Sequence, residues 1–284
     1  MHEWHLPDRV LRLEGRPLVM GIVNVTPDSF SDGGRFFAPE AAVAHGLKLV
    51  AQGADLLDIG GESTRPGAEP VPPDEELRRV LPVVTALARQ TPVPLSIDTY
   101  KAEVARQALA AGAQIVNDVT ALRDPGMAEV VRGRRAGLIL MHMQGTPPTM
   151  QLNPTYADVV AEVGQFLEER LQAAADLGIA REQVVVDPGI GFGKRHRHNL
   201  QLLARLDELQ RLGRPVCLGV SRKGFIAKIT GHPLDPHGAG SVAVALHALA
   251  HRAVQVIRAH DVEETVDAVK VFVAVDELRK EAGA

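Results

Sequence analysis

Eight short, mainly apolar segments of the chain each end in side chains that could do chemistry. The side chains at these ends are Asn24, Asp58 with Glu62, Asp98, Asn117 with Asp118, His142, Asp187, Ser221 with Arg222 and Lys223, and Arg258 with His260 and Asp261. Any single Asp or Asn could simply cap the next helix, which is the simpler interpretation for Asp58, Asp118 and Asp261. The whole set combines carboxylates and amides with Arg, Lys and His, which favours a shared binding or catalytic site over unrelated caps.

Strand and helix signals alternate along the chain. Short apolar, β-branched runs predict eight strands, at residues 17–24, 55–60, 94–98, 114–118, 137–142, 184–187, 216–220 and 254–260. Amphipathic stretches predict a helix after each strand, at residues 39–52, 74–89, 101–111, 126–134, 156–177, 199–212, 238–252 and 261–280. This alternation is typical of βα units around a parallel sheet.

Eight βα units in 284 residues predict a closed (β/α)8 TIM barrel, an α/β fold, with a doubly wound open sheet as the alternative. We expect a single domain over residues 1–284, in which residues 1–16 cap the lower end of the barrel. In a parallel barrel the carboxyl ends of all strands lie on one rim, where the βα loops build the active site. The polar side chains at the strand ends are therefore expected to converge.

Composition and charge disfavour several classes of protein. With 31 basic and 35 acidic residues the net charge is −4, which argues against a nucleic-acid partner. Cys217 is the only cysteine, so the chain has neither an intrachain disulfide nor a cysteine-rich zinc site. The longest uncharged apolar stretch, residues 238–250, is too short to cross a membrane, and the N-terminal segment lacks the apolar core of a secretory signal. We expect a cytoplasmic protein with no membrane partner.

The loop after the sixth predicted strand is rich in glycine. Gly189, Gly191 and Gly193 alternate with larger residues directly after Asp187, which lets the backbone approach a ligand closely. Phe192 stands between two of these glycines and is expected to project at the rim, with simple core packing as the alternative. The spacing fits neither a P-loop nor the G-x-G-x-x-G fingerprint, so no nucleotide motif is present.

The loops after the first two predicted strands, residues 26–34 and 60–67, are polar and rich in turn formers. We interpret them as lids that exclude water from a reactive intermediate. Asp28 and Arg65, among otherwise small residues, favour phosphate or metal binding there. Mg²⁺ fits better than zinc, because it takes few protein oxygens and prefers water and phosphate oxygens.

Eight motifs, in order, resemble the dihydropteroate synthase family. They are MGIVNVTPDSFSDGG (residues 20–34), GADLLDIGGESTRPG (53–67), SIDTYK (96–101), IVNDV (115–119), MHMQGTP (141–147), DPGIGFGK (187–194), GVSRKGF (219–225) and RAHDV (258–262). Together they extend over roughly residues 17–262 and reach every predicted strand end, which makes the resemblance highly specific.

The resemblance implies a transferase of folate biosynthesis that joins 6-hydroxymethyl-7,8-dihydropterin diphosphate to p-aminobenzoate and releases pyrophosphate. It implies pterin binding by Asp98, Asn117, Asp187, Lys223 and Arg258. It implies p-aminobenzoate binding by Thr64, Pro66, Phe192, Lys223 and Gly224, and diphosphate binding by Asn24, Thr64, Arg65, Arg258 and His260. The catalytic residues would be Asp98, Lys223, Arg258, His260 and Arg65, with Asn24 as a ligand of Mg²⁺.

The mechanism that we expect is dissociative: pyrophosphate leaves first, and the amine of p-aminobenzoate attacks the resonance-stabilised pterin methylene cation. Asp98 would offset the cation, while Arg65, Arg258, His260 and Mg²⁺ hold the pyrophosphate. No covalent enzyme intermediate is needed, which suits the lack of an evident nucleophile with a paired base. The family also implies a homodimer and inhibition by sulfonamides. The almost wholly apolar helix 241–250 either packs on the barrel or extends into a subunit contact.

One position departs from the family pattern. Many members have a Ser directly after the Arg-Lys pair, where this chain has Gly224. A helix beginning at Gly224 can still offer backbone N–H groups to the p-aminobenzoate carboxylate. Two other functions stay open. A pterin-dependent methyltransferase would share Asp98, Asn117 and Asp187 but needs no diphosphate pocket, and a catalytically silent paralogue would only bind pterin or phosphate.

Overall fold

Eight parallel strands form the centre of the molecule. The computed structural model describes residues 2–26, 39–64, 67–232 and 238–281. The strands are β3 (Leu18–Asn24), β4 (Leu56–Gly60), β5 (Leu95–Asp98), β6 (Ile115–Asp118), β7 (Gly137–Met141), β8 (Val184–Asp187), β9 (Cys217–Gly219) and β10 (Val256–Ala259). They are ordered β8-β7-β6-β5-β4-β3-β10-β9, and a bridge between Val186 and Val216 joins the two ends. This closure confirms the predicted (β/α)8 barrel and excludes the open sheet.

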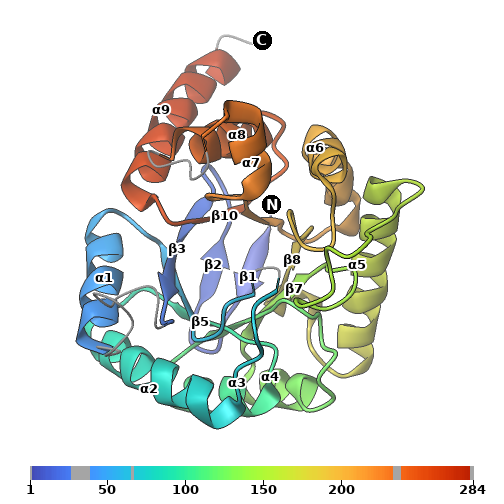
Figure 1. The fold of residues 1–284 in the computed structure, drawn as a ribbon. Coiled ribbons are helices and arrows are strands. Elements are labelled where there is room, and N and C mark those ends of the chain that lie inside the picture. The colour runs from blue at the N-terminus through green and yellow to red at the C-terminus, as the bar shows by residue number, and fades with distance from the viewer. Residues whose placement is uncertain (1, 27–38, 65–66, 233–237, 282–284) are drawn as a thin grey trace.

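Helices surround the barrel on its outside (Figure 1). They are α1 (Pro39–Ala51), α2 (Pro73–Gln90), α3 (Ala102–Ala110), α4 (Met127–Arg134), α5 (Val159–Asp176), α6 (His196–Ala204), α7 (Gly224–Thr230), α8 (Ala239–Ala250) and α9 (Val262–Glu281). Helix α2 begins at Pro73, where the missing N–H of proline costs no hydrogen bond. Helix α5 begins three residues later than predicted, because the Asp158 side chain accepts hydrogen bonds from the N–H groups of Val160 and Ala161 and so caps it.

Two helical segments differ from the prediction. The stretch predicted as one helix over residues 199–212 consists of α6 and a 3-10 helix, η2 (Leu206–Leu212), because the backbone of Arg205 leaves the helical region. Although the helix type changes, Leu206 and Leu209 of η2 are still buried. The short helix α7 stands between β9 and α8 as an addition to the eight predicted helices.

An N-terminal hairpin closes the amino end of the barrel, as predicted for residues 1–16. Its strands β1 (Glu3–His5) and β2 (Val10–Arg12) are antiparallel. Trp4 is completely buried against the first inward-facing residues of the barrel strands, Met20, Leu56, Ile115, Ile139, Val185, Cys217 and Val256. Its indole N–H donates to the Gln183 carbonyl oxygen at 2.8 Å. This apolar plug leaves the opposite end of the barrel as the open one.

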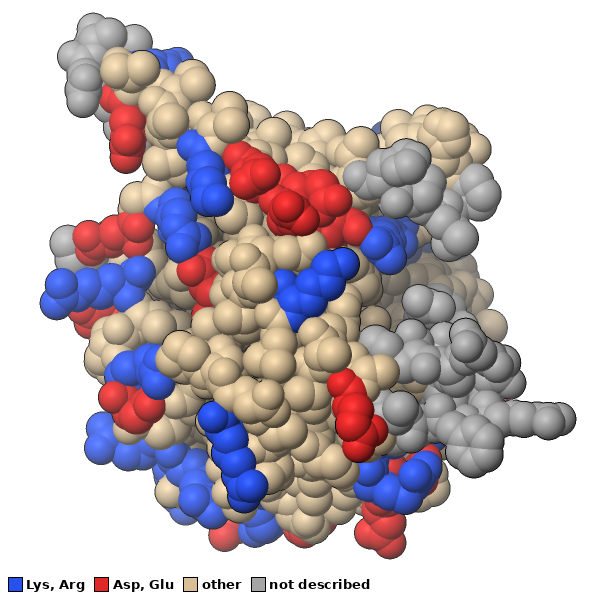
Figure 2. All heavy atoms as spheres, turned by 90° about the vertical axis from the view of Figure 1, so that its left-hand side faces the viewer, with Lys and Arg blue, Asp and Glu red and all other residues tan. Residues whose placement is uncertain are grey.

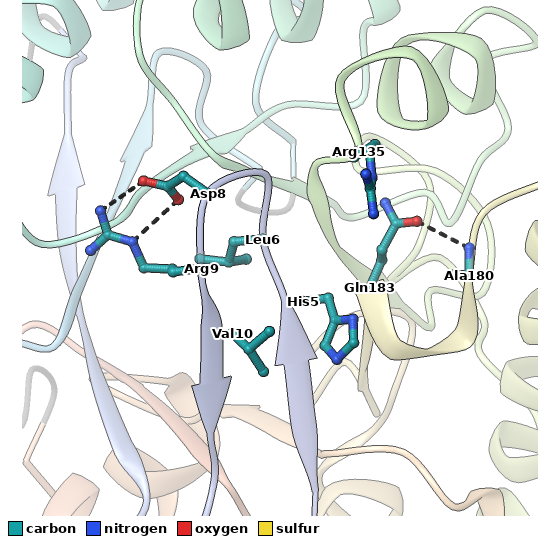
Figure 3. Close-up of a pocket in the computed structure, with 8 residues that line it drawn as sticks. All are labelled: His5, Leu6, Asp8, Arg9, Val10, Arg135, Ala180 and Gln183. Carbon is teal, nitrogen blue, oxygen red and sulfur yellow. Dashed lines mark hydrogen bonds and ion pairs between the residues drawn. The ribbon is translucent and has the colours of Figure 1, made fainter.

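A hollow of about 310 Å³ lies beside this hairpin (Figure 3). It is lined by His5, Leu6, Asp8, Arg9, Val10, Arg135, Ala180 and Gln183. Arg9 donates to the Pro92 carbonyl oxygen at 3.0 Å, and Asp8 accepts a hydrogen bond from the Gln114 side chain at 2.7 Å. These contacts tie the hairpin to the barrel, so the hollow belongs to the capped end.

Strand register places the polar strand ends at one level. Asn24 is opposite Gly60, Gly60 is opposite Asp98, and Asp98 is opposite Asn117 in neighbouring strands. Asp187 ends β8 beside Met141 of β7. Along a barrel strand, side chains point alternately into the barrel and out of it. Residues that lie opposite one another in neighbouring strands therefore point to the same side and form one layer. The register therefore builds a polar layer at the carboxyl end of an apolar barrel.

The outer surface has mixed charge. On the face that carries α1, α2 and α9, acidic and basic side chains are interspersed (Figure 2). This pattern agrees with the near balance of acidic and basic residues in the sequence. None of the helices in the described ranges is long and apolar enough to cross a membrane.

Candidate active site

Arg258 is the centre of the polar layer. Its Nε donates to Asp58 Oδ2 at 2.6 Å, and one of its terminal nitrogens donates to Asp98 Oδ2 at 2.8 Å. Asn117 Nδ2 donates to the same Asp58 oxygen at 3.0 Å. The four residues come from β10, β4, β5 and β6, so the structure brings together side chains that are up to 200 positions apart in the sequence.

Asp187 lies at the same mouth as Arg258. A Cβ placed on Gly219 would lie 3.8 Å from Arg258 Cδ and 4.0 Å from Asp187 Oδ2, so the two side chains flank this glycine. Asp187 Oδ1 accepts the backbone N–H of Gly189 at 2.6 Å, which orients the carboxylate. One small molecule can therefore contact both side chains.

Asp58 belongs to this site, although its place in the sequence suggested only a helix cap or a supporting residue. It is 0% exposed, and its Oδ2 holds both Arg258 and Asn117, while Oδ1 has no hydrogen-bond partner among the described residues. The sequence does carry one sign of this role, because Asp58 stands between Leu57 and Ile59 and so interrupts an apolar strand. Such a residue faces the barrel interior rather than a helix N-terminus.

Burial sets the electrostatics of the mouth. It raises the pKa of Asp98 to about 7, although the Arg258 guanidinium lowers that pKa in part. Burial also raises the pKa of Asp187, against the opposing effect of Lys223. It lowers the pKa of Lys223 to about 8, with Asp187 acting in the opposite direction. Strongly shifted groups that gather at one end of a barrel are typical of a functional site.

Lys223 and Phe192 form the neighbouring part of the mouth. Lys223 Nζ donates to the Ile190 carbonyl oxygen and lies 4.5 Å from the centre of the Phe192 ring. The ring also packs on an apolar cluster of Val119, Met141, Met143 and Met150. Phe192 is thus partly a core residue and partly a wall beside Lys223, which combines the two interpretations that the sequence left open.

Asn24 and His260 stand on the other side of the mouth. Asn24 Nδ2 and His260 Nε2 are 3.5 Å apart. The hydroxyl of Ser221 contacts His260 Nδ1 at 3.0 Å and accepts the His260 backbone N–H at 3.1 Å. Ser221 therefore orients the imidazole, a role that its place in the sequence did not reveal.

The remaining predicted residues border the site or lie outside the described residues. Thr64 is half-buried in the loop after β4, and Gly224 is exposed at the start of α7. Arg65 and Pro66, together with residues 27–34 of the first loop, lie outside the described residues. The structure therefore does not test the lid interpretation of the two loops.

A buried charge cluster holds the start of the second loop. Lys101 Nζ donates to both Glu62 and Glu76, and Tyr100 donates to Glu62 Oε1 at 2.8 Å. Glu62 stands two positions before Thr64, so these contacts position the residue that leads into the predicted diphosphate-binding segment. The sequence analysis missed the cluster, because its members are far apart in the chain.

The residues of the mouth fit a magnesium ion only if the substrate supplies most of its ligands. Among the described residues, no group of three or more His, Cys, Asp or Glu side chains could hold a metal. Asn24 contributes a single half-buried amide oxygen. Mg²⁺ commonly binds through one or two protein oxygens together with water and substrate phosphates, so this donor set is compatible with a diphosphate-bound ion.

The barrel and its mouth define an enzyme that binds a small polar molecule at the carboxyl ends of its strands. A family model described as pterin binding enzyme matches residues 20–260. The dihydropteroate synthase of Escherichia coli K12 is 46% identical over 258 residues, which cover 91% of each chain. The chain therefore belongs to the pterin binding enzymes, and within them to the dihydropteroate synthase family of transferases.

Solved structures agree with this assignment. The dihydropteroate synthase of Xanthomonas albilineans with 4-aminobenzoic acid superposes with a TM-score of 0.90 at 55% identity, covering 96% of this chain and 98% of that one. The Yersinia pestis enzyme in complex with a sulfonamide drug has a TM-score of 0.91 at 43% identity, with coverage of 97% and 99%. These relatives favour the synthase over the pterin-dependent methyltransferase that the sequence left open.

Proposed function

We propose that this chain condenses 6-hydroxymethyl-7,8-dihydropterin diphosphate with p-aminobenzoate to give 7,8-dihydropteroate and pyrophosphate. The observation that carries the proposal is the cluster of Arg258, Asp58, Asp98 and Asn117 at one mouth, with Asp187 beside it. Pyrophosphate release, measured with and without p-aminobenzoate and Mg²⁺, tests it. A methyltransferase or a silent pterin-binding protein would release none under any of these conditions.

The pterin ring is proposed to bind between Asp187 and Asn117. A pterin presents a ring N–H and an exocyclic NH₂ in the same direction, and a carboxylate accepts such a pair of donors. Asn117 can both donate and accept on the remaining edge, and Lys223 can donate to the carbonyl or a ring nitrogen. Asp98 borders the other side of the ring, near the carbon that reacts.

The reaction proceeds by departure of the leaving group before attack. The bond between the pterin methylene carbon and the diphosphate oxygen breaks, and pyrophosphate leaves with the electron pair. The amine nitrogen of p-aminobenzoate then bonds to the methylene carbon and loses a proton to water. The Asp98 carboxylate offsets the positive charge of the intermediate, while Arg258, His260 and Asn24 bind the departing anion together with Arg65.

Asn24 is the residue proposed to hold Mg²⁺, with further ligands from the diphosphate and water. When bound, the ion would neutralise charge that develops on the leaving pyrophosphate. Ser221 keeps the His260 imidazole oriented toward the same anion through its contact at Nδ1.

The p-aminobenzoate ring is proposed to lie against Phe192 and the aliphatic part of Lys223, with Thr64 and Pro66 on its other side. The N-terminal N–H groups of α7, beginning at Gly224, face the region of its carboxylate. A sulfonamide has the same aromatic amine and a comparable anionic end, so we propose that sulfonamides compete for this subsite.

The pH dependence of turnover is expected to report Asp98. Its pKa is raised to about 7, so the carboxylate ionises as the pH rises through neutrality. Because the ionised form offsets the cation, kcat/KM for the pterin substrate should rise about tenfold per pH unit below that value and level off above it. The pH–rate profile of Asp98→Asn should lack this rising limb, and its kcat/KM should stay at a much lower, constant value. If the limb persists in the variant, it comes from another group or from the substrate.

Gly224→Ser is expected to strengthen p-aminobenzoate binding. A Cβ at this position meets no atom within 4 Å, so the side chain fits without rearrangement. One added hydrogen bond to a carboxylate should contribute about 1 kcal/mol, which lowers the KM for p-aminobenzoate about fivefold. Steady-state kinetics with the pterin substrate saturating would measure this. An unchanged or higher KM would show that the position 224 side chain does not reach the carboxylate.

A homodimer is also proposed for this chain. Helix α8, for which the sequence left packing on the barrel and a subunit contact both open, buries Ser241, Ala245, Ala248 and Leu249 within its own subunit. Helix α9 lies at the outer edge of the molecule (Figure 1). Its side chains Val271, Val275 and Leu278 are exposed, and their spacing puts them in one stripe on a single face of the helix. Exposed apolar stripes of this kind often mark subunit contacts. Light scattering on the wild type and on Val275→Asp would test whether this stripe joins two copies.

A further inference from the structure

Lys194 is a buried lysine for which the proposed function has no role. It is the last residue of the glycine-rich loop after β8, and it is only 2% exposed. Its Nζ lies 2.8 Å from His142 Nδ1, and it donates to the Gly189 carbonyl oxygen at 2.9 Å and to the Phe192 carbonyl oxygen at 3.0 Å. A buried lysine costs free energy unless its hydrogens are satisfied, so its place here requires an explanation.

The three close contacts of the Lys194 amino group are all satisfied. Its N–H groups donate to the carbonyl oxygens of Gly189 and Phe192, and at His142 Nδ1 an ammonium group donates while a neutral amine accepts the ring N–H. Burial and the nearby Lys194 lower the pKa of His142 to about 2, so the imidazole is neutral and its Nδ1 can accept. Burial lowers the pKa of Lys194, and the Asp187 carboxylate acts against that shift.

The three groups that Lys194 Nζ contacts follow two neighbouring strands. His142 directly follows β7, and the carbonyl groups of Gly189 and Phe192 stand at the start and near the end of the loop after β8. The loop packs directly on β7: Gly189 has a φ of +65°, and a Cβ there would lie 1.9 Å from the His142 carbonyl oxygen. Lys194 therefore joins the loop to the neighbouring strand at the point of closest approach.

The same loop carries groups on both sides of the proposed site. The Gly189 N–H is bonded to Asp187 Oδ1, and the Phe192 N–H is bonded to the Gly189 carbonyl oxygen at 3.0 Å. The Phe192 ring faces Lys223 Nζ. If Lys194 releases the two carbonyl groups, the turn between Gly189 and Phe192 loses its contact with His142, and the ring loses its fixed place.

We propose that Lys194 is a positioning residue that sets the p-aminobenzoate subsite by clamping the turn from Gly189 to Phe192 onto His142. The identity of the ligand rests on the proposed function. The clamp itself does not, because it is a property of the folded chain. Lys194 itself touches neither the reacting atoms nor the diphosphate.

Lys194→Met tests the clamp, because methionine has similar length and no donor. We expect the KM for p-aminobenzoate to rise about tenfold, the effect of losing the buried hydrogen bonds that hold the turn. The kcat and the KM for the pterin substrate should change less than about threefold, since uniform binding of one substrate is what is lost. Lys228→Met, at an exposed lysine of α7, is the matched control and should leave all three constants unchanged.

Two kinetic outcomes would overturn the proposal. A lower melting temperature with an unchanged KM for p-aminobenzoate would show that Lys194 only stabilises the fold. A lower kcat with an unchanged KM for p-aminobenzoate would show that it acts on the chemical step. A wild-type enzyme that forms no product would instead remove the proposed function, and the clamp would then be decided by hydrogen exchange.

Amide hydrogen exchange tests the clamp without any substrate. In Lys194→Met the amides of residues 189–193 should exchange faster, while those of β3 to β6 keep their wild-type rates. Unchanged exchange in this segment would refute the clamp. If Lys194→Met does not fold, the acceptor can be changed instead: His142→Leu should accelerate exchange in the same segment. His142→Asn, whose side-chain oxygen can replace Nδ1, should restore slow exchange.

Discussion

Replacing Arg258 by Met is expected to remove most of the activity and a measurable part of the stability. The guanidinium holds Asp58 and Asp98 together in the barrel mouth, at 2.6 Å and 2.8 Å. Without it, two buried carboxylates face each other with no cation between them, which should lower the free energy of unfolding by about 3–5 kcal/mol. In the proposed mechanism Arg258 also binds the departing pyrophosphate, so its loss should lower kcat about 10³-fold.

The two effects of Arg258→Met can be separated by pH. Burial raises the pKa of Asp98, and loss of the Arg258 cation, which lowers that pKa in part, should raise it further in the variant. The protonated form of Asp98 is then favoured in the folded state, so the loss of stability should be largest above neutrality and shrink as the pH falls. Activity should not return at low pH, because the missing anion-binding group is not replaced. Urea unfolding at pH 5.5 and pH 8, with turnover at both, measures this.

Arg205→Met is the matched control for that experiment. Arg205 also pairs with two carboxylates, those of Asp158 and Glu208, but it is on the surface and away from the mouth. Exposed ion pairs contribute little, so both stability and turnover should stay near the wild-type values. If Arg258→Met and Arg205→Met lose equal stability at both pH values, the buried cluster has no special role.

The sequence predicted the barrel and most of the site for a physical reason. Each strand is a short apolar run, and each run stops where a side chain must reach water or a ligand. Predicted and observed strand bounds therefore agree within one or two residues, as for residues 184–187 and β8. Once the strands are parallel and closed, the fold itself places Asn24, Asp98 and Arg258 on one rim.

The contacts behind the site could not be predicted in the same way. Asp58 is recognised as a partner of Arg258 only when β4 and β10 are placed around β3. Lys194 stands in a motif whose glycines explain the turn, but nothing in the sequence shows that its ammonium reaches His142. A sequence gives residue types along the chain, while the partner of a buried charge depends on register and side-chain direction.

Asp187→Asn is expected to abolish recognition of the pterin without harming the fold. The retained side-chain oxygen of Asn would accept the Gly189 N–H, as Asp187 Oδ1 does at 2.6 Å. Its NH₂ group would then face the ring N–H and the exocyclic NH₂ of the pterin, and these two buried donors would have no acceptor. A site built to hydrogen-bond a substrate rejects such a mismatch strongly, and kcat/KM for the pterin substrate should fall about 10⁴-fold.

The stability of Asp187→Asn should be equal to or higher than that of the wild type at neutral pH. Burial raises the folded-state pKa of Asp187 above its ordinary value. A carboxyl group with a raised pKa favours the folded state at low pH, and this contribution is lost as the pH rises through that pKa. The ionised group therefore opposes folding at pH 7, and a neutral amide does not. Calorimetric melting at pH 7 measures the difference.

Asp158→Asn is the control, because Asp158 likewise accepts backbone N–H groups but caps α5, where Asn serves equally well. It should leave both turnover and melting temperature unchanged. The decisive pattern is a variant at position 187 that melts no earlier than the wild type and yet binds a pterin analogue too weakly to detect by calorimetry. If Asp187→Asn binds that analogue normally, the carboxylate does not hold the donor edge of the ring, and the pterin must lie elsewhere in the mouth.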